Sequence, residues 1–263
     1  MRLAALLLAV APFALPATKL LVTVVEQKSA QPVKDLQAAD FTVLDDRRPC
    51  AVEGAEAAGG LMDVMLLLDT SLLGEMVPPV AGTLIAQLQP KDQMAVVAFH
   101  SSADLIQDFT ASQELLRRAV TGVKFGNAPK VLDALYAAMD GGFRSAGFRR
   151  VILLLTAGVE GPSRVTGREV LRLARRNGVS IYPVYVVGAE RSLFEMLARE
   201  TGGATFNLRD LRRHLGGPPG ERVFQVLRSC YTLTVAGNLS LGEKIKVEVK
   251  RSGKYMVSWL PLD

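Results

Sequence analysis

Residues 63–71 read DVMLLLDTS, an apolar run that ends at Asp69 and is followed at once by two hydroxyl residues. A nearly unbroken apolar run of this length is typical of a strand that helices cover on both faces. The same pattern recurs in three later stretches, QMAVVAFH (93–100), RRVILLLT (149–156) and VSIYPVYVV (179–187). These four stretches predict a parallel sheet at the core of an α/β domain.

Amphipathic segments lie around these predicted strands. Their apolar residues recur at spacings of three and four, as on one face of a helix, and three of the segments close on glycine. The segments are EMVPPVAGTLIAQL (75–88), SQELLRRAVTGV (112–123), VLDALYAAMDGGF (131–143), REVLRLARRNG (168–178) and SLFEMLARETGG (192–203). The alternation of strand and helix predicts a doubly wound, mostly parallel, Rossmann-like sheet.

The two ends of the chain have a different, strand-rich pattern. The N-terminal part contains TKLLVTVVEQ (18–27) and FTVLDDRRP (41–49), followed by AEAAGG (55–60), which we interpret as a linker of small residues. The C-terminal part contains CYTLTVAGN (230–238), KIKVEVKR (244–251) and KYMVSWL (254–260), which alternate with a period of two. Either group is too small to bury a face by itself. We therefore expect the end strands to pair into one small antiparallel β unit.

Length and charge set limits on the class of protein. With 263 residues, 49% of them hydrophobic, the chain can bury a sizeable core. It is mildly basic, with 31 Lys and Arg against 26 Asp and Glu, but the cations are scattered through helical segments such as LARR and LRDLRR. Such runs are typical of solvated helix faces, and no aromatic residues alternate with them. The sequence therefore predicts no nucleic-acid partner.

The first residues predict export. Arg2 precedes the apolar stretch LAALLLAVAPFALPA (3–17), which is too short to span a membrane and has the length of a signal-peptide core. We expect cleavage after Ala17 and a secreted or periplasmic mature chain without further membrane contact; an uncleaved anchor or a hydrophobic first strand are the alternatives. The expected divisions are a signal peptide (1–17), an N-terminal strand segment (18–58), an α/β domain (59–216) and a C-terminal helix with strands (217–263).

Cys50 and Cys230 are the only cysteines. In an oxidising compartment, two thiols that meet in space are usually joined. Pairing of the end strands would bring Cys50, at the end of an N-terminal strand, toward Cys230, at the start of a C-terminal one. We therefore expect a disulfide, with two separate thiols as the alternative.

The order of DVMLLLDTS, VLDALYAAM and RRVILLLTAG resembles the von Willebrand factor type A (vWA) fold. The chain is more closely similar to the exported vWA-related proteins of bacteria, in which residues 22–49 and LRSCYTLTV (227–235) also fit. The resemblance implies a doubly wound sheet whose strand ends present a cluster of binding loops, beside a separate β unit.

The resemblance also implies a metal-ion-dependent adhesion site (MIDAS), built from a DxSxS loop, a threonine and a further aspartate. This chain keeps Asp69 and Ser71 of that set, but Leu73 replaces the second serine. Pro129 stands where the threonine is expected, unless the alignment shifts by one residue, and Ala157 replaces the second aspartate. Because Mg²⁺ takes six oxygen ligands in near-octahedral order, we expect a degenerate site and no cofactor, with bound Mg²⁺ as the alternative.

Two side chains could compensate for the lost ligands, Glu75 and Glu160, although nothing in the sequence requires it. Without a cation, Asp69 would accept hydrogen bonds from backbone N–H groups at the start of the following helix.

The predicted function is binding of a protein or surface polymer, without enzymatic activity and without an obligate metal. The binding loops would be those of Asp69, Thr70, Ser71, Pro129 and Ala157. Metal-dependent adhesion is one alternative. A hydrolase that uses Ser71, His100 and either Asp69 or Asp133 is a weaker one, because Ser71 lies in no G-x-S-x-G turn. A nucleotide enzyme is also disfavoured, since no glycine-rich phosphate loop follows the first strand of the predicted sheet.

Overall fold

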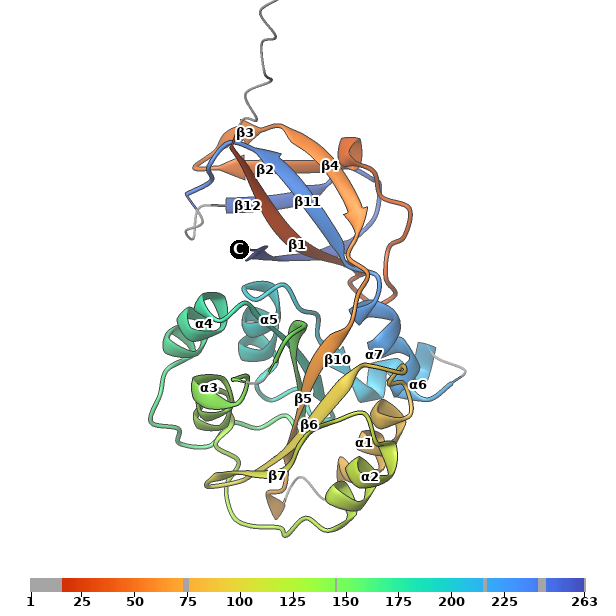
Figure 1. Cartoon of the computed structure of the whole chain (residues 1–263), viewed down its shortest axis with the longest axis vertical. Helices are drawn as coiled ribbons and strands as arrows, with labels where there is room; N and C mark the ends of the chain where they lie inside the picture. The colour runs from red at the N-terminus through yellow and green to blue at the C-terminus, as the bar shows by residue number, and fades with distance from the viewer. Residues whose placement is uncertain (1–15, 73–75, 145, 215–216, 241–244, 263) are drawn as a thin grey trace, which may run out of the picture.

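The computed structural model describes residues 16–72, 76–144, 146–214, 217–240 and 245–262. Residues 1–15 of the predicted signal peptide lie outside this part of the chain, as do Leu73 and Glu75. Figure 1 shows an α/β unit and a smaller all-β unit joined end to end. Within the described ranges, no helix is long and apolar enough to cross a membrane.

The α/β unit is built on a six-stranded sheet with the order β10-β9-β8-β5-β6-β7. All neighbouring strands are parallel except β7, which runs antiparallel to β6 at one edge. The doubly wound, mostly parallel sheet is therefore confirmed, whereas β7 was not predicted. The strands are β5 (Met62–Asp69), β6 (Gln93–Phe99), β7 (Ala103–Thr110), β8 (Arg149–Thr156), β9 (Val179–Tyr185) and β10 (Phe206–Asn207).

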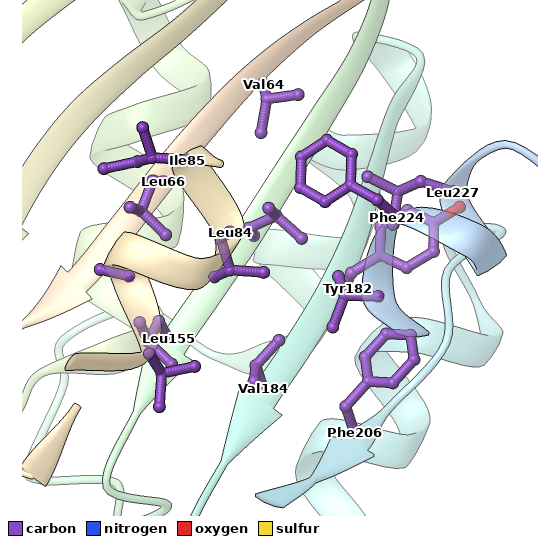
Figure 2. Packing of buried hydrophobic residues seen from close by; sticks show 14 of the residues in the cluster. Val64, Leu66, Leu84, Ile85, Leu155, Tyr182, Val184, Phe206, Phe224 and Leu227 are labelled. Atoms are coloured by element: carbon purple, nitrogen blue, oxygen red, sulfur yellow. The ribbon is translucent and has the colours of Figure 1, made fainter. Parts of the chain in front are cut away.

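Helices cover both faces of this sheet. On one face lie α1 (Pro78–Ile85), α2 (Gln113–Thr121), α6 (Leu208–His214) and α7 (Pro219–Leu227); on the other lie α3 (Val131–Gly141), α4 (Gly167–Arg176) and α5 (Arg191–Arg199). Side chains along β5 alternate between the two cores, so Leu66 packs with α1 and α7 while Leu67 packs on the other face. Figure 2 shows the first core, in which α1 and α7 contribute side chains that point toward those of the strands. Burial on both faces explains the unbroken apolar runs.

The end strands form two antiparallel sheets, ordered β13-β1-β11-β4 and β12-β2-β3, with a shared apolar core between them. Their bounds are β1 (Ala17–Glu26), β2 (Phe41–Asp45), β3 (Arg48–Cys50), β4 (Val52–Ala57), β11 (Tyr231–Ala236), β12 (Ile245–Val249) and β13 (Tyr255–Leu262); a short 3-10 helix spans Ala38–Asp40. Because β1 pairs with both β11 and β13, the predicted β unit of N- and C-terminal strands is confirmed. The expected linker at 55–60 is wrong for residues 55–57, which end β4.

The two units contact each other through buried hydrogen bonds. The Thr23 hydroxyl on β1 donates to the Gly202 carbonyl at 2.7 Å, and the Ser258 hydroxyl on β13 donates to the Gly203 carbonyl at 2.5 Å. The guanidinium of Arg175 on α4 lies over the ring of Trp259 on β13, 5.5 Å from its centroid. The β unit therefore packs directly against the loop after α5 and against α4.

The expected disulfide is wrong, because both cysteines are free. The register of β11 on β4 explains their separation. It starts with Tyr231 beside Ala57 and ends with Val235 beside Val52, so Cys50 and Cys230 lie near opposite ends of the ladder. Six residues of extended strand span about 20 Å, whereas a disulfide requires Cα atoms less than about 7 Å apart.

We predict that both thiols react with an alkylating agent when the protein is denatured without reductant. Mass spectrometry should show two added groups, as in a sample that was reduced first. Alkylation that appears only after reduction would contradict the strand register described above.

Candidate functional site

The carboxyl ends of β5 and β8 bring Asp69 next to Thr156. In the sheet register Leu68 lies beside Leu155, and Asp69 lies beside Phe99 of β6. Asp69 is completely buried. A buried carboxylate must be paired or hydrogen-bonded, since its desolvation is otherwise very costly.

The carboxylate of Asp69 accepts hydrogen bonds from three donors. Oδ1 accepts a hydrogen bond from the Ser71 backbone N–H at 2.9 Å, and Oδ2 accepts one from the Thr156 hydroxyl at 2.8 Å and one from the Ala157 backbone N–H at 3.0 Å. The predicted donors were all at the start of the following helix, but two of these come from the end of β8 and the loop after it. Asp69 therefore ties two strand ends together. Thr156 was not predicted as its partner, although it ends the run RRVILLLT.

The loop before α3 is joined to the same edge by backbone hydrogen bonds. The Gly126 N–H donates to the Thr70 carbonyl at 2.8 Å, and the Leu72 N–H donates to the Gly126 carbonyl at 3.1 Å. A Cβ at Gly126 would lie 2.6 Å from the ring of His100, so any larger residue would require that ring to move. Thr70 in turn donates its hydroxyl to the Phe99 carbonyl at 3.0 Å.

The side chains predicted to form the binding loops lie inside this edge. All five are buried: Asp69, Thr70, Ser71, Pro129 and Ala157. Their exposed neighbours are Leu72, Met76 and Phe125, whose exposed fractions are 65%, 50% and 41%. We call these three residues the strand-end patch. A molecule that docked on this edge would touch the strand-end patch, whereas the buried residues fix the loops that carry it.

Glu160 holds the start of α3. Its carboxylate accepts hydrogen bonds from the backbone N–H groups of Val131 at 2.8 Å and Leu132 at 3.5 Å, which have no partner inside the helix. Burial and the charge of Asp133 raise the pKa of Glu160, and these hydrogen bonds only partly offset the rise. Glu160 was considered as a substitute metal ligand, but it acts here as a helix cap.

Among the residues that the structure describes at this edge, few side-chain oxygens are free to bind Mg²⁺. One carboxylate, Asp69, already accepts three hydrogen bonds, and only one hydroxyl, that of Ser71, is buried at this edge without a hydrogen-bond partner in the described ranges. Within those ranges, no three His, Cys, Asp or Glu side chains lie close enough to hold a metal together. Six oxygen ligands are needed, and Pro129 and Ala157 offer no side-chain oxygen.

The structure does not assemble the alternative hydrolytic triad. His100 Nδ1 lies 2.8 Å from the Ser101 hydroxyl, and the Ser71 hydroxyl has no hydrogen-bond partner among the residues that the structure describes. Asp133 accepts hydrogen bonds from the backbone N–H groups of Arg164 and Val165. A general base within hydrogen-bond reach of the nucleophile is therefore missing from this arrangement.

We predict that Glu160→Gln removes a component of the pH dependence of stability. Because the folded state raises this pKa, unfolding releases a proton, and the free energy of unfolding falls as the pH rises through and above the ordinary glutamate value of about 4.3. The amide that replaces the carboxylate would keep an acceptor oxygen for α3 but would not titrate. Urea unfolding over this pH range measures the effect.

Glu169→Gln is the matched control with the opposite sign. Hydrogen bonds from the Thr166 backbone and hydroxyl lower the pKa of Glu169, so its contribution is present at neutral pH and is lost as the pH falls. Equal pH profiles for the wild type and both variants would contradict these assignments.

The comparisons with known proteins agree with this architecture. The von Willebrand factor type A domain model matches residues 63–216, which is more than half of the chain. Proximal thread matrix protein 1 from the mussel byssus matches with a TM-score of 0.54 and 17% identity, over 73% of this chain and 50% of that one. A structure of the same mussel protein with zinc in its MIDAS motif matches to the same extent.

An aerotolerance-related membrane protein from Bacteroides fragilis NCTC 9343 matches with a TM-score of 0.49 and 11% identity, over 64% of this chain and 98% of that one. At these identities the likeness shows the fold alone, and the chain spans half the length of the mussel protein. No curated protein matches the chain in sequence. The family match and the doubly wound sheet agree: the chain belongs to the von Willebrand factor type A family.

Proposed function

We propose that this chain is an exported, non-enzymatic binding module whose strand-end loops recognise a protein or surface polymer without an obligate metal. Domains of the vWA family generally mediate protein–protein interaction or adhesion. The observation that carries the proposal is the strand-end patch, since Leu72, Met76 and Phe125 expose apolar side chains at the edge where the family places its metal site. Exposed apolar groups of this kind are typical of interaction surfaces.

The buried residues beneath the patch support this role. Asp69 ties the loop after β5 to the end of β8, and Gly126 joins the loop before α3 to the same place. The loops are thus held in one arrangement before any partner arrives. Preorganisation of this kind lowers the entropy cost of binding.

Metal-dependent adhesion is the second candidate, and Ser71 is the observation in its favour. Its buried hydroxyl has no hydrogen-bond partner within the described ranges, as would be expected of a ligand or of a group that binds a water molecule. The loss of ligand oxygens at positions 129 and 157 weighs against this candidate.

Export is the third element of the proposal. Cleavage after Ala17 would leave Thr18 as the first residue of the mature chain. The Thr18 hydroxyl donates to the Gly237 carbonyl at 2.9 Å and accepts from the Leu239 N–H at 3.1 Å. The mature chain would therefore keep these two hydrogen bonds of Thr18, but it would lose the pairing of Ala17 with Ala236 and the hydrogen bond from the Gly237 N–H to the Pro16 carbonyl at 2.7 Å.

We predict that Leu72→Glu and Phe125→Glu each reduce partner capture at least tenfold. The mature chain serves as bait in a pull-down from the culture medium or periplasm of its native host. A charge at either position would have to be desolvated in an apolar interface, and tenfold corresponds to about 1.4 kcal/mol. Because both side chains are exposed, the melting temperature should hardly change.

Phe148→Glu is the matched control for these variants. Phe148 is similarly exposed but directly precedes β8, so it lies at the opposite edge of the sheet. Its variant should capture the partner as well as the wild type does. Equal capture by all three variants would show that binding occurs elsewhere.

We also predict that Asp69→Ala lowers the free energy of unfolding by about 2–4 kcal/mol, because it leaves three donors unpaired in a buried place. The loss should be the same with millimolar Mg²⁺ and with EDTA, since a ligand stabilises a protein only when its concentration is near or above Kd. Thermal and urea unfolding measure both effects. A rise in the melting temperature of the wild type with Mg²⁺, abolished by Asp69→Ala, would favour metal-dependent adhesion instead.

A further inference from the structure

A small cavity lies where the chain passes from the β unit into the α/β unit. It has a volume of about 170 Å³ and is lined by the connecting residues Ala58, Gly59 and Gly60, and by side chains that include Arg149 and Arg228. Nothing lies within 4 Å of a Cβ built on either glycine. The cavity is therefore open beside the backbone of the connection.

Arg149 is only partly satisfied in this place, although its side chain forms a hydrogen bond with Cys230. It is the first residue of β8, and its Nε and Nη2 atoms are buried without a hydrogen-bond partner within the described ranges. A guanidinium remains charged at any ordinary pH. Leaving its donors buried and unpaired is costly, so a structure of this kind normally provides an anion or acceptor.

The nearby carboxylates are already occupied. Asp92 is buried and accepts from the Arg228 guanidinium at 2.5 Å, from the Gln89 N–H at 3.0 Å and from the Met62 N–H at 3.2 Å. One aspartate therefore faces two arginines, and the cavity carries an excess of one positive charge.

The sulfur of Cys230 contacts Arg149 and two carbonyl oxygens. It lies 3.6 Å from the Val226 carbonyl oxygen and 3.5 Å from the Leu227 carbonyl oxygen, and a side-chain hydrogen bond links it to Arg149. These contacts leave the Nε and Nη2 donors of Arg149 unpaired. Tyr182, which also lies near Cys230, stays neutral because burial raises its pKa.

We propose that this cavity binds a small oxyanion of the phosphate or sulfate class through Arg149, with Arg228 contributing to the positive potential. A guanidinium presents two parallel N–H donors that match the oxygens of such an anion. The volume of the cavity suits a single small ion better than an organic ligand. Since Gly59 and Gly60 connect the two units, a bound ion would also hold them together.

The test compares sodium sulfate with sodium chloride at equal ionic strength, using thermal unfolding of the mature full chain. Sulfate also stabilises proteins by exclusion from their surface, so the informative quantity is the part of the rise that depends on Arg149. We expect the melting temperature of the wild type to rise at least about 3 °C more than that of Arg149→Met. In chloride, Arg149→Met should be at least as stable as the wild type, because an unpaired buried charge is removed.

Two control variants locate the effect. Arg117→Met changes an exposed arginine on α2, and Arg172→Met changes an arginine that lines a larger, arginine-rich cavity between α4 and α5. Both should keep the response of the wild type to sulfate. If Arg149→Met fails to fold, Arg149→Lys provides the comparison, because it keeps the charge but loses the paired donors.

Titration calorimetry with inorganic phosphate gives an independent readout, with one ion bound by the wild type and none by Arg149→Met. An equal response to sulfate in the wild type and in Arg149→Met would overturn the proposal. So would loss of the response in Arg172→Met alone, which would place the anion between α4 and α5.

Discussion

The burial of a single carboxylate governs the functional edge of this domain. Asp69 ends a strand whose two faces are covered by helices, so its side chain cannot reach water and must find donors in neighbouring segments. The donors that it finds belong to the loop after β5, to the end of β8 and to the residue after it. In this structure Asp69 therefore ties the loop after β5 to the end of β8.

A second constraint is the pairing of the chain ends. β1 lies between β11 and β13, so the α/β unit is inserted between strands of the other unit. The two crossings between the units, after β4 and after α7, then run close together, and the Ala58 N–H donates to the Cys230 carbonyl at 2.7 Å. This closeness places Arg149 and Arg228 beside the connecting glycines. The small cavity lined by Arg149 and Arg228 is thus a consequence of the insertion of the α/β unit between strands of the β unit.

The sequence predicted the strands and helices that are identified by the burial of their side chains. It did not predict features that depend on strand register or on tertiary contacts. Runs such as LLL at 66–68 identify strands covered on both faces. The alternation of apolar and polar residues in the end strands indicated a second unit, whose strands expose one face to solvent. β7 has mixed polar and apolar residues because it is an edge strand, so its pattern is weak. Whether Cys50 and Cys230 can form a disulfide depends on the register of β11 on β4, which no local sequence pattern encodes. Likewise, Pro129 and Ala157 stand in loop positions, but whether a loop residue points inward depends on its tertiary contacts.

The size of the strand-end patch limits how a partner can bind. Complete burial of three apolar side chains contributes about 1.5–3 kcal/mol each, which only balances the cost of bringing two molecules together. A stable complex therefore needs more contact area than Leu72, Met76 and Phe125 provide. Within the described ranges, β7 offers a further apolar surface, because Leu105 and Ile106 are exposed there. β7 begins beside Phe99 at the same edge of the sheet, so a partner that covered both surfaces would follow the loops onto the free edge of β7.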